Sequence, residues 1–183
     1  MEVILAKTAG FCFGVNRAIR MAEEAAGRYK NCVTYGPIIH NRNVVEKLAE
    51  SGVYAVNSME EMKPGSTVII RSHGIGKTQY DRLKEIAGTV IDATCPDVAK
   101  IHDTGREESQ EGRLIFIIGE KQHPEVLAIA DWCKESCVFE SAEELKQWLQ
   151  EHPEQKNAPI AVVSQTTGTQ DNFELCIKII KKE

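Results

Sequence analysis

Two cysteines stand where an apolar run passes into a helix-like segment, so each thiol is predicted to be presented rather than packed. Cys12 lies in Gly-Phe-Cys-Phe-Gly, after the apolar run 3–6. Cys95 lies in Thr-Cys-Pro, after the run 89–91. Thiolates bind metal ions and iron-sulfur clusters, whereas a free cysteine can also be a small buried apolar residue. The neighbouring glycines and proline favour the ligand role.

Three histidines also follow apolar runs and are candidates for binding an anion. They are His40 after 33–36, His73 after 67–70 and His123 after 114–118. Imidazoles donate hydrogen bonds to phosphate oxygens and, when protonated, supply positive charge. A single histidine of this kind is more often structural, but three at converging strand ends favour a binding site. His102, in a helix-like segment, and His152, in a polar stretch, are interpreted as structural.

The cysteines and histidines belong to an internal repeat. Three pairs of residues share one spacing of 83 positions: Cys12 and Cys95, Gly36 and Gly119, and His40 and His123. Such a period indicates duplicated units, here two domains formed by residues 1–95 and 96–183. Cys95 follows His73 by 22 positions, and Thr166 occupies the place of His73 in the second unit. A third cysteine is therefore expected 22 positions after Thr166, near position 188. A third repeat is therefore expected to be absent from this chain.

Strand-like and helix-like segments alternate along the chain, which predicts an α/β fold with a mostly parallel sheet in each domain. The expected strands are 3–6, 33–36, 53–56, 67–70, 90–91, 114–118, 137–139 and 159–163. Helices are expected between them, one of them starting at a capping box at 141–144, and the polar stretch 151–157 is expected to be a surface loop. Ligands bind beyond the carboxyl ends of parallel strands, where the candidate residues fall.

Composition argues against several classes of function. The 183 residues carry a formal net charge of −5 and no cluster of lysine and arginine, so nucleic acid is not an expected partner. No apolar run approaches the length of a membrane span, and the N-terminus is too short and too charged for a signal peptide. Six cysteines without such a signal predict reduced thiols in the cytoplasm.

Several motifs, in chain order, resemble the family of 4-hydroxy-3-methylbut-2-enyl diphosphate reductases, the last enzymes of the non-mevalonate isoprenoid pathway. The matching segments are Gly10-Phe11-Cys12-x-Gly14-Val15, His40-Asn41-Arg42, Ser72-His73-Gly74, Asp92-Ala93-Thr94-Cys95-Pro96, Gly119-x-x-x-His123-Pro124-Glu125-Val126 and Gln165-Thr166-Thr167. The resemblance implies a trefoil of three α/β domains around a 4Fe-4S cluster held by three cysteines. This chain would contain two of those domains and two of those ligands, Cys12 and Cys95.

The resemblance also implies a reaction. The allylic substrate, 4-hydroxy-3-methylbut-2-enyl diphosphate, takes up two electrons and two protons and loses its hydroxyl group as water. The products are isopentenyl and dimethylallyl diphosphates, and a ferredoxin- or flavodoxin-type protein would supply the electrons. Because the third domain and its cysteine lie outside this chain, the chain is expected to be inactive alone.

The same resemblance implies roles for individual residues. His40, His73 and His123 would bind the diphosphate, and His123 would also take part in catalysis. Glu125 would donate a proton, and Thr166 would bind the substrate hydroxyl within a proton relay. On residue type alone, Glu125 is an ordinary first-turn glutamate and Thr166 a helix cap, a part that Thr167 or Thr169 could equally take.

A second hypothesis is a non-redox metal- or anion-binding module in which the two cysteines and nearby histidines hold zinc. Cys133 and Cys137 lie four positions apart but are not interpreted as zinc ligands, because no second pair at zinc-like spacing is near them. Cys32 and Cys176 are expected in the core.

Overall fold

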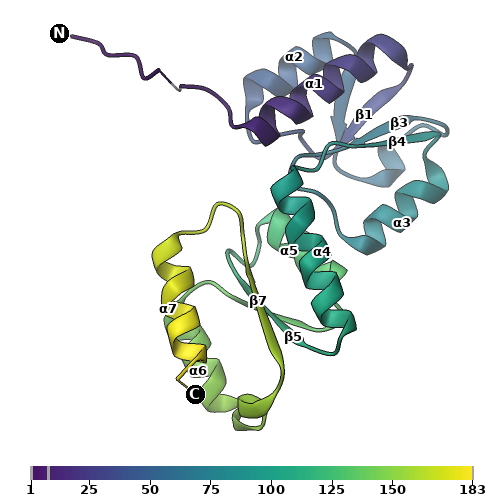
Figure 1. Cartoon of the computed structure of the whole chain (residues 1–183). Helices are drawn as coiled ribbons and strands as arrows, with labels where there is room; N and C mark the ends of the chain where they lie inside the picture. Colours follow the sequence, from purple (N-terminus) through teal and green to yellow (C-terminus); the bar gives the residue numbers. More distant parts are fainter. Residues whose placement is uncertain (1, 8, 183) are drawn as a thin grey trace.

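The computed structural model of the chain describes residues 2–7 and 9–182. It contains two β-sheets, each made of parallel strands and covered by helices (Figure 1). The predicted α/β fold class is confirmed, since strands and helices alternate along the chain and every strand pair is parallel. The three-domain trefoil stays a prediction.

The first sheet has four strands in the order β2-β1-β3-β4. They are β1 (Cys32–Tyr35), β2 (Val53–Val56), β3 (Thr67–Ile70) and β4 (Thr89–Asp92). One face packs against α1 (Phe13–Arg28) and α2 (Arg42–Glu50). The other face packs against α3 (Lys77–Ile86) and the 3-10 helix η1 (Met59–Glu61). All four residues of β3 are buried, which suits a central strand covered on both faces.

The second sheet has three strands in the order β6-β5-β7. They are β5 (Leu114–Ile118), β6 (Ser136–Phe139) and β7 (Ile160–Ser164). One face packs against α4 (Pro96–Gln110) and α5 (Pro124–Trp132), and the other against α6 (Ala142–Glu151) and α7 (Gln170–Ile180). The order β2-β1-β3 of the first sheet is therefore repeated as β6-β5-β7. The boundary between residues 95 and 96 stays a prediction.

Side chains at the end of α5 hold the second sheet against the first. The indole N–H of Trp132 donates to the carbonyl of Ile75 at 2.9 Å. The Asp131 carboxylate accepts from the backbone N–H of Thr78 at 2.8 Å and from the Thr78 hydroxyl at 3.1 Å. An acidic group at the first turn of α3 is favourable because the helix N-terminus is positive. These contacts bring together the ends of the two sheets that carry the candidate site residues.

The prediction of a strand at 3–6 is wrong. Residues 2–7 have no regular secondary structure and extend away from the first sheet (Figure 1). The side chains of Val3, Ile4 and Leu5 are 81%, 84% and 84% exposed. An apolar run becomes a strand only where a neighbour takes up its backbone hydrogen bonds, and no described strand pairs with this one.

Two smaller expectations also differ from the structure. The polar stretch predicted as a loop contains the 3-10 helix η2 (Pro153–Asn157), which Pro153 can begin because a first-turn residue needs no N–H. Ser141 caps α6 as predicted, but the Glu144 carboxylate accepts from the N–H of Glu140 and not from that of Ser141. Throughout the part of the chain that the structure describes, no helix has both the length and the apolar character needed to cross a membrane.

Candidate functional site

Three imidazole rings gather where the two sheets meet. His40 follows β1, His73 follows β3 and His123 follows β5. The ring centroids lie 4.5 Å apart for His40 and His73, 5.5 Å for His73 and His123, and 6.0 Å for His40 and His123. One nitrogen of each ring lies within 4.8 Å of the other two. The structure thus brings together the three histidines that the sequence singled out.

Backbone hydrogen bonds around Ser72 tie three strand ends together. The N–H of Ser72 donates to the carbonyl of Ile38 at 3.2 Å, which joins the loop after β3 to the loop after β1. The N–H of Cys95 donates to the carbonyl of Ser72 at 2.9 Å, which joins the segment after β4. Ser72 is buried, and the sequence analysis gave it no role. Its signal was a small polar residue two positions after an apolar strand.

The tautomer of His123 is fixed by the start of α5. His123 is the N-cap residue, and its Nδ1 accepts from the backbone N–H of Glu125 at 3.2 Å. A nitrogen that accepts a hydrogen bond carries no proton, so the proton of the neutral ring lies on Nε2. His123 can therefore donate one hydrogen bond to an anion through Nε2–H while it caps the helix.

His73 is the most strongly perturbed of the three histidines. Burial, as the largest cause, and the nearby charges of His40, Arg71 and His123 together lower its pKa from 6.5 to about 4. Its Nδ1 is buried and has no hydrogen-bond partner within the described part of the chain. His73 is therefore neutral at pH 7 and offers a hydrogen bond rather than the positive charge that the sequence analysis considered.

Glu125 and Thr166 form a pair that joins α5 to the loop after β7. The Glu125 side chain is only 1% exposed. Its Oε1 accepts from the backbone N–H of Thr166 at 2.6 Å, and its Oε2 accepts from the Thr166 hydroxyl at 2.8 Å. The Thr166 hydroxyl is thus engaged with Glu125 and does not cap α7, whose N-cap residue is Thr169.

Gln165 is a further buried polar residue beside this pair, and the sequence analysis gave it no role. Its Oε1 accepts from the N–H of Glu120 at 3.0 Å, and its Nε2 donates to the Thr167 hydroxyl at 2.8 Å. Gly119 lies against it, and a Cβ on Gly119 would come within 2.8 Å of the Gln165 Cβ. Gln165 therefore fixes the loop after β7 against the loop after β5, and so holds Thr166 in place.

Cys12 and Cys95 occupy equivalent places at the starts of two helices. Cys12 is the N-cap residue of α1 and Cys95 that of α4, and neither side chain makes a capping hydrogen bond. A Cβ built on Gly14 would overlap the Cys95 sulfur, so this sulfur lies against the first turn of the helix that Cys12 begins. Arg17 strengthens the junction by donating to the carbonyl of Thr94 at 3.0 Å.

The two thiols fit the role of iron-sulfur ligands. Cys12 is exposed, Cys95 is partly exposed, and both are free. Helix N-termini favour negatively charged groups such as metal-bound thiolates. Gly14 leaves the space that the sulfur of Cys95 needs beside α1. The chain therefore offers two free thiols at helix starts that are suited to this role.

The remaining cysteines are packed. Cys32 and Cys176 are buried in two of the hydrophobic clusters. The thiol of Cys133 donates to the carbonyl of Ile129 at 3.2 Å, and burial raises its pKa to about 11. Burial also raises the pKa of Cys137, and the charge of Glu135 adds to this effect. Raised thiol pKa values oppose metal binding, which requires the thiolate.

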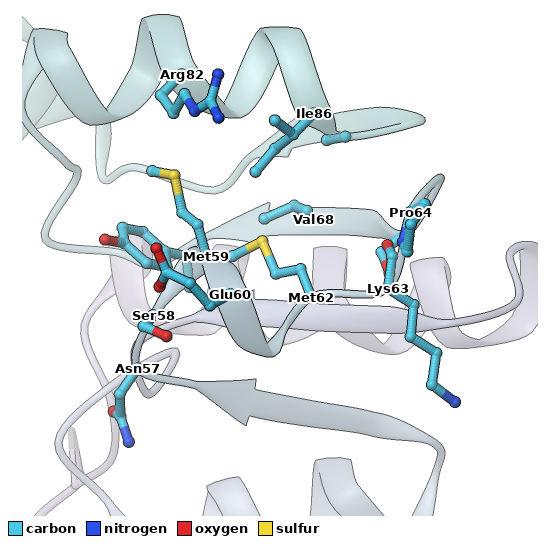
Figure 2. Close-up of a pocket in the computed structure, with 13 residues that line it drawn as sticks. Asn57, Ser58, Met59, Glu60, Met62, Lys63, Pro64, Val68, Arg82 and Ile86 are labelled. Carbon is cyan, nitrogen blue, oxygen red and sulfur yellow. The ribbon is translucent and has the colours of Figure 1, made fainter.

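A well-formed cavity lies away from these residues. A hollow of about 660 Å³ opens between η1, the end of α3 and strand β3 (Figure 2). Met59, Met62, Val68 and Ile86 give it an apolar lining, and Glu60 and Arg82 are among its polar residues. None of the histidines, cysteines or other predicted site residues lines it. This cavity is therefore separate from the cluster of histidines and cysteines.

The stability of the chain is expected to fall in mild acid. Burial lowers the pKa of both His73 and His102 from 6.5 to about 4, so between these pH values the unfolded chain binds protons that the folded chain does not. The unfolding free energy should therefore decrease as the pH falls from 6.5 to 4, by on the order of a few kcal/mol, with the smaller share from the less buried His73. Urea unfolding at several pH values measures this.

Replacing His102 tests whether buried histidines cause the loss of stability in acid. His102 stacks on Trp132 with ring centroids 6.1 Å apart, and its Nε2 is buried without a partner among the described residues. Glutamine cannot gain a proton in this range, so His102→Gln should flatten the decline in unfolding free energy below pH 6.5. An unchanged slope in this variant would contradict the assignment.

Comparison with known proteins identifies the relatives of this chain. Residues 3–183 match the family model described as LytB protein. A protein of Trichlorobacter lovleyi named 4-hydroxy-3-methylbut-2-enyl diphosphate reductase is 43% identical over 95% of this chain and 60% of its own length. A protein of the same name from Caldanaerobacter subterraneus is 37% identical over 100% of this chain and 63% of its own length.

Solved structures agree with this match. The E-1-hydroxy-2-methyl-but-2-enyl-4-diphosphate reductase of Plasmodium falciparum superposes with a TM-score of 0.87 and 27% identity, over 96% of this chain and 55% of that one. A structure titled (E)-4-hydroxy-3-methyl-but-2-enyl diphosphate reductase, the terminal enzyme of the non-mevalonate pathway, gives a TM-score of 0.82 and 36% identity, over 98% of this chain and 63% of that one. The chain thus spans about 60% of the length of the first curated relatives. Family model, relatives and solved structures agree with one another, and the chain belongs to the LytB protein family.

Proposed function

We propose that this chain forms the larger part of a reductase that converts 4-hydroxy-3-methylbut-2-enyl diphosphate to isopentenyl and dimethylallyl diphosphates. The observation that carries this proposal is the convergence of three imidazoles with the buried Glu125 and Thr166 pair at the meeting of the two sheets. Because the chain spans about 60% of the relatives' length, the activity is proposed for a protein of the relatives' length.

Cys12 and Cys95 would hold a 4Fe-4S cluster together with a third cysteine from outside this chain. The predicted domains, 1–95 and 96–183, would each contribute one thiolate from the N-terminal end of a helix. When bound, such a cluster supplies electrons and a Lewis-acidic iron. The exposure of Cys12 and the partial exposure of Cys95 support this role, since a substrate must reach the cluster.

His40, His73 and His123 would bind the diphosphate of the substrate. His123 donates through Nε2–H because its Nδ1 is occupied by the N–H of Glu125. His73 is neutral at pH 7 and can donate from whichever nitrogen carries its proton. A positive helix N-terminus at His123 adds attraction for the anion. Imidazole N–H groups in this arrangement give directional hydrogen bonds to phosphate oxygens.

Glu125 and Thr166 would deliver a proton to the leaving hydroxyl group. Glu125 is too deeply buried to touch the substrate, whereas Thr166 is exposed and its hydroxyl lies 2.8 Å from the Glu125 carboxylate. A proton can pass from the Glu125 carboxyl group to the Thr166 oxygen while the Thr166 proton passes to the substrate hydroxyl. With two electrons and a second proton, the carbon–oxygen bond breaks and water leaves. His123 keeps Glu125 in place by capping the same helix turn.

The protein would work in the cytoplasm with an electron donor of the ferredoxin or flavodoxin type. All six cysteines are free thiols, which suits a reducing compartment. Because the net charge is −5, nucleic acid is not an expected partner.

The test is turnover by a family-length protein, here this chain joined to the remaining segment of the Trichlorobacter lovleyi reductase. After anaerobic reconstitution with iron and sulfide, a chemically reduced viologen dye should be oxidised when the allylic diphosphate is added. Both isopentenyl and dimethylallyl diphosphates should appear. An iron-loaded protein that consumes no substrate would refute the proposal.

A second candidate function is a non-redox module that binds zinc. The spacing of the three histidines favours it, since one nitrogen of each lies within 4.8 Å of the others. Against it, a metal on Nε2 of His123 would require Nδ1 to carry the proton, and Nδ1 already accepts from Glu125. A colourless protein that retains zinc after anaerobic reconstitution would favour the module, and a brown one the reductase.

A further inference from the structure

We infer that Arg71 supplies the permanent positive charge of the diphosphate site, an inference that rests on the proposed function. Arg71 is the first residue after β3 and stands two positions before His73. The motifs that resemble the reductase family do not include it, and neither composition nor spacing marks it. Its role follows from where the folded chain places its charge.

The guanidinium group of Arg71 is packed behind the histidine loops. A Cβ on Gly36 would lie 2.6 Å from Nη1, so the group lies directly against the turn that leads to His40. Gly36 has a φ of +72°, a conformation that favours glycine and allows this close approach. The Nε–H of Arg71 donates a long hydrogen bond to the carbonyl of Gly74 at 3.5 Å. Arg71 thus lies between the loops that carry His40 and His73.

No carboxylate of residues 2–7 and 9–182 forms an ion pair with Arg71. Other arginines of the chain do pair: Arg42 with Glu46, Arg82 with Glu85, and Arg106 with Asp103. A half-buried cation without a counter-ion is costly, and burial accordingly lowers the pKa of Arg71. An anion held by the neighbouring histidines would relieve that cost.

The charge of Arg71 acts on the histidine cluster. It is one of the groups that lower the pKa of His73, after burial and the charge of His40. Since His73 is neutral at pH 7, the imidazoles alone leave much of the charge of a diphosphate unbalanced. Arg71 remains protonated and therefore balances part of it.

Asp131 is the competing partner for Arg71. Both line a hollow of about 360 Å³ together with Pro124, the residue after His123. The Asp131 carboxylate is already engaged, because it accepts from both the N–H and the hydroxyl of Thr78. If Arg71 served mainly to hold Asp131, its loss would change the stability of the chain and leave anion affinity unaltered.

Titration calorimetry with inorganic pyrophosphate separates these roles. In this chain, Arg71→Met should weaken pyrophosphate binding by about tenfold or more, whereas Arg71→Lys should stay within about threefold of the unsubstituted chain. Arg82→Met removes the same charge from the same half of the chain at an exposed ion pair and should change the affinity by less than about twofold. If Arg71→Met disturbs the fold, Arg71→Gln removes the same charge while keeping a polar side chain.

Three results would overturn the inference, and they differ from one another. Equal affinities for Arg71→Gln, Arg71→Met and the unsubstituted chain would reject the role of Arg71 alone. An equal loss of pyrophosphate affinity in Arg82→Met would show that the effect of Arg71 is not specific to its position beside the histidines. No binding of pyrophosphate by the unsubstituted chain would reject the proposed diphosphate site and this inference with it. In the family-length protein, Arg71→Met should raise KM by about tenfold and change kcat much less.

Discussion

Replacing Gly14 with alanine is expected to prevent cluster loading and to destabilise the chain. A Cβ at this position would overlap the sulfur of Cys95 and come within 3.1 Å of its Cβ, so α1 and the start of α4 would have to move apart. Overpacking of this kind costs about 1–3 kcal/mol. In the family-length protein, iron content after anaerobic reconstitution should fall to a small fraction of that of the unsubstituted protein.

Gly27 provides the matched control in the same helix. Among the described residues, no atom beyond the neighbouring backbone of its own helix lies within 4 Å of a Cβ built on Gly27, and its φ is not in the left-handed region. Because alanine has a higher helix propensity than glycine, Gly27→Ala should stabilise the chain by up to about 1 kcal/mol and leave the iron content unchanged. Full iron loading by Gly14→Ala would show that the contact between α1 and Cys95 does not position a ligand.

Replacing Glu125 with alanine is expected to lower stability and, in the family-length protein, to remove nearly all activity. The change deletes a carboxylate that accepts two hydrogen bonds from Thr166 and leaves a space in the core. Unsatisfied groups and cavities of this kind cost about 2–4 kcal/mol, measurable by urea unfolding. Loss of a proton donor should reduce kcat by at least about a hundredfold.

Two further variants separate structure from chemistry at Glu125. Glu143 also lies in the first turn of a helix but is exposed, so Glu143→Ala should change stability by less than about 1 kcal/mol. Thr166→Val keeps the backbone hydrogen bond to Glu125 and removes only the hydroxyl. It should reduce kcat and lower the free energy of unfolding by about 1–3 kcal/mol, because the buried Oε2 of Glu125 loses its hydrogen-bond partner. Normal turnover by Thr166→Val would contradict the relay through Thr166.

Much of the framework could be predicted from local patterns. The repeated spacing correctly placed helix starts at Cys12 and Cys95, because glycine, proline and apolar periodicity act over a few residues. The gathering of His40, His73 and His123 could also be anticipated, since residues after parallel strands share one edge of a sheet.

Tertiary contacts could not be predicted in the same way. Nothing in the spacing shows that Glu125 accepts hydrogen bonds from Thr166, 41 positions later, or that Gly14 lies against Cys95. The apolar run 3–6 failed as a strand because pairing depends on a neighbouring strand and not on the run itself. That Arg71 forms no ion pair with a carboxylate of residues 2–7 and 9–182 likewise becomes visible only in the folded structure.

Iron content after anaerobic reconstitution tests most directly whether Cys12 and Cys95 hold one cluster. The family-length protein and its Cys137→Ser variant, altered at a thiol outside the site, should both contain about four iron atoms per chain and show broad visible absorption. Cys12→Ser and Cys95→Ser should each lose most of that iron and the absorption. Full iron content and unchanged absorption in either of these two variants would contradict a cluster shared by the two helix starts.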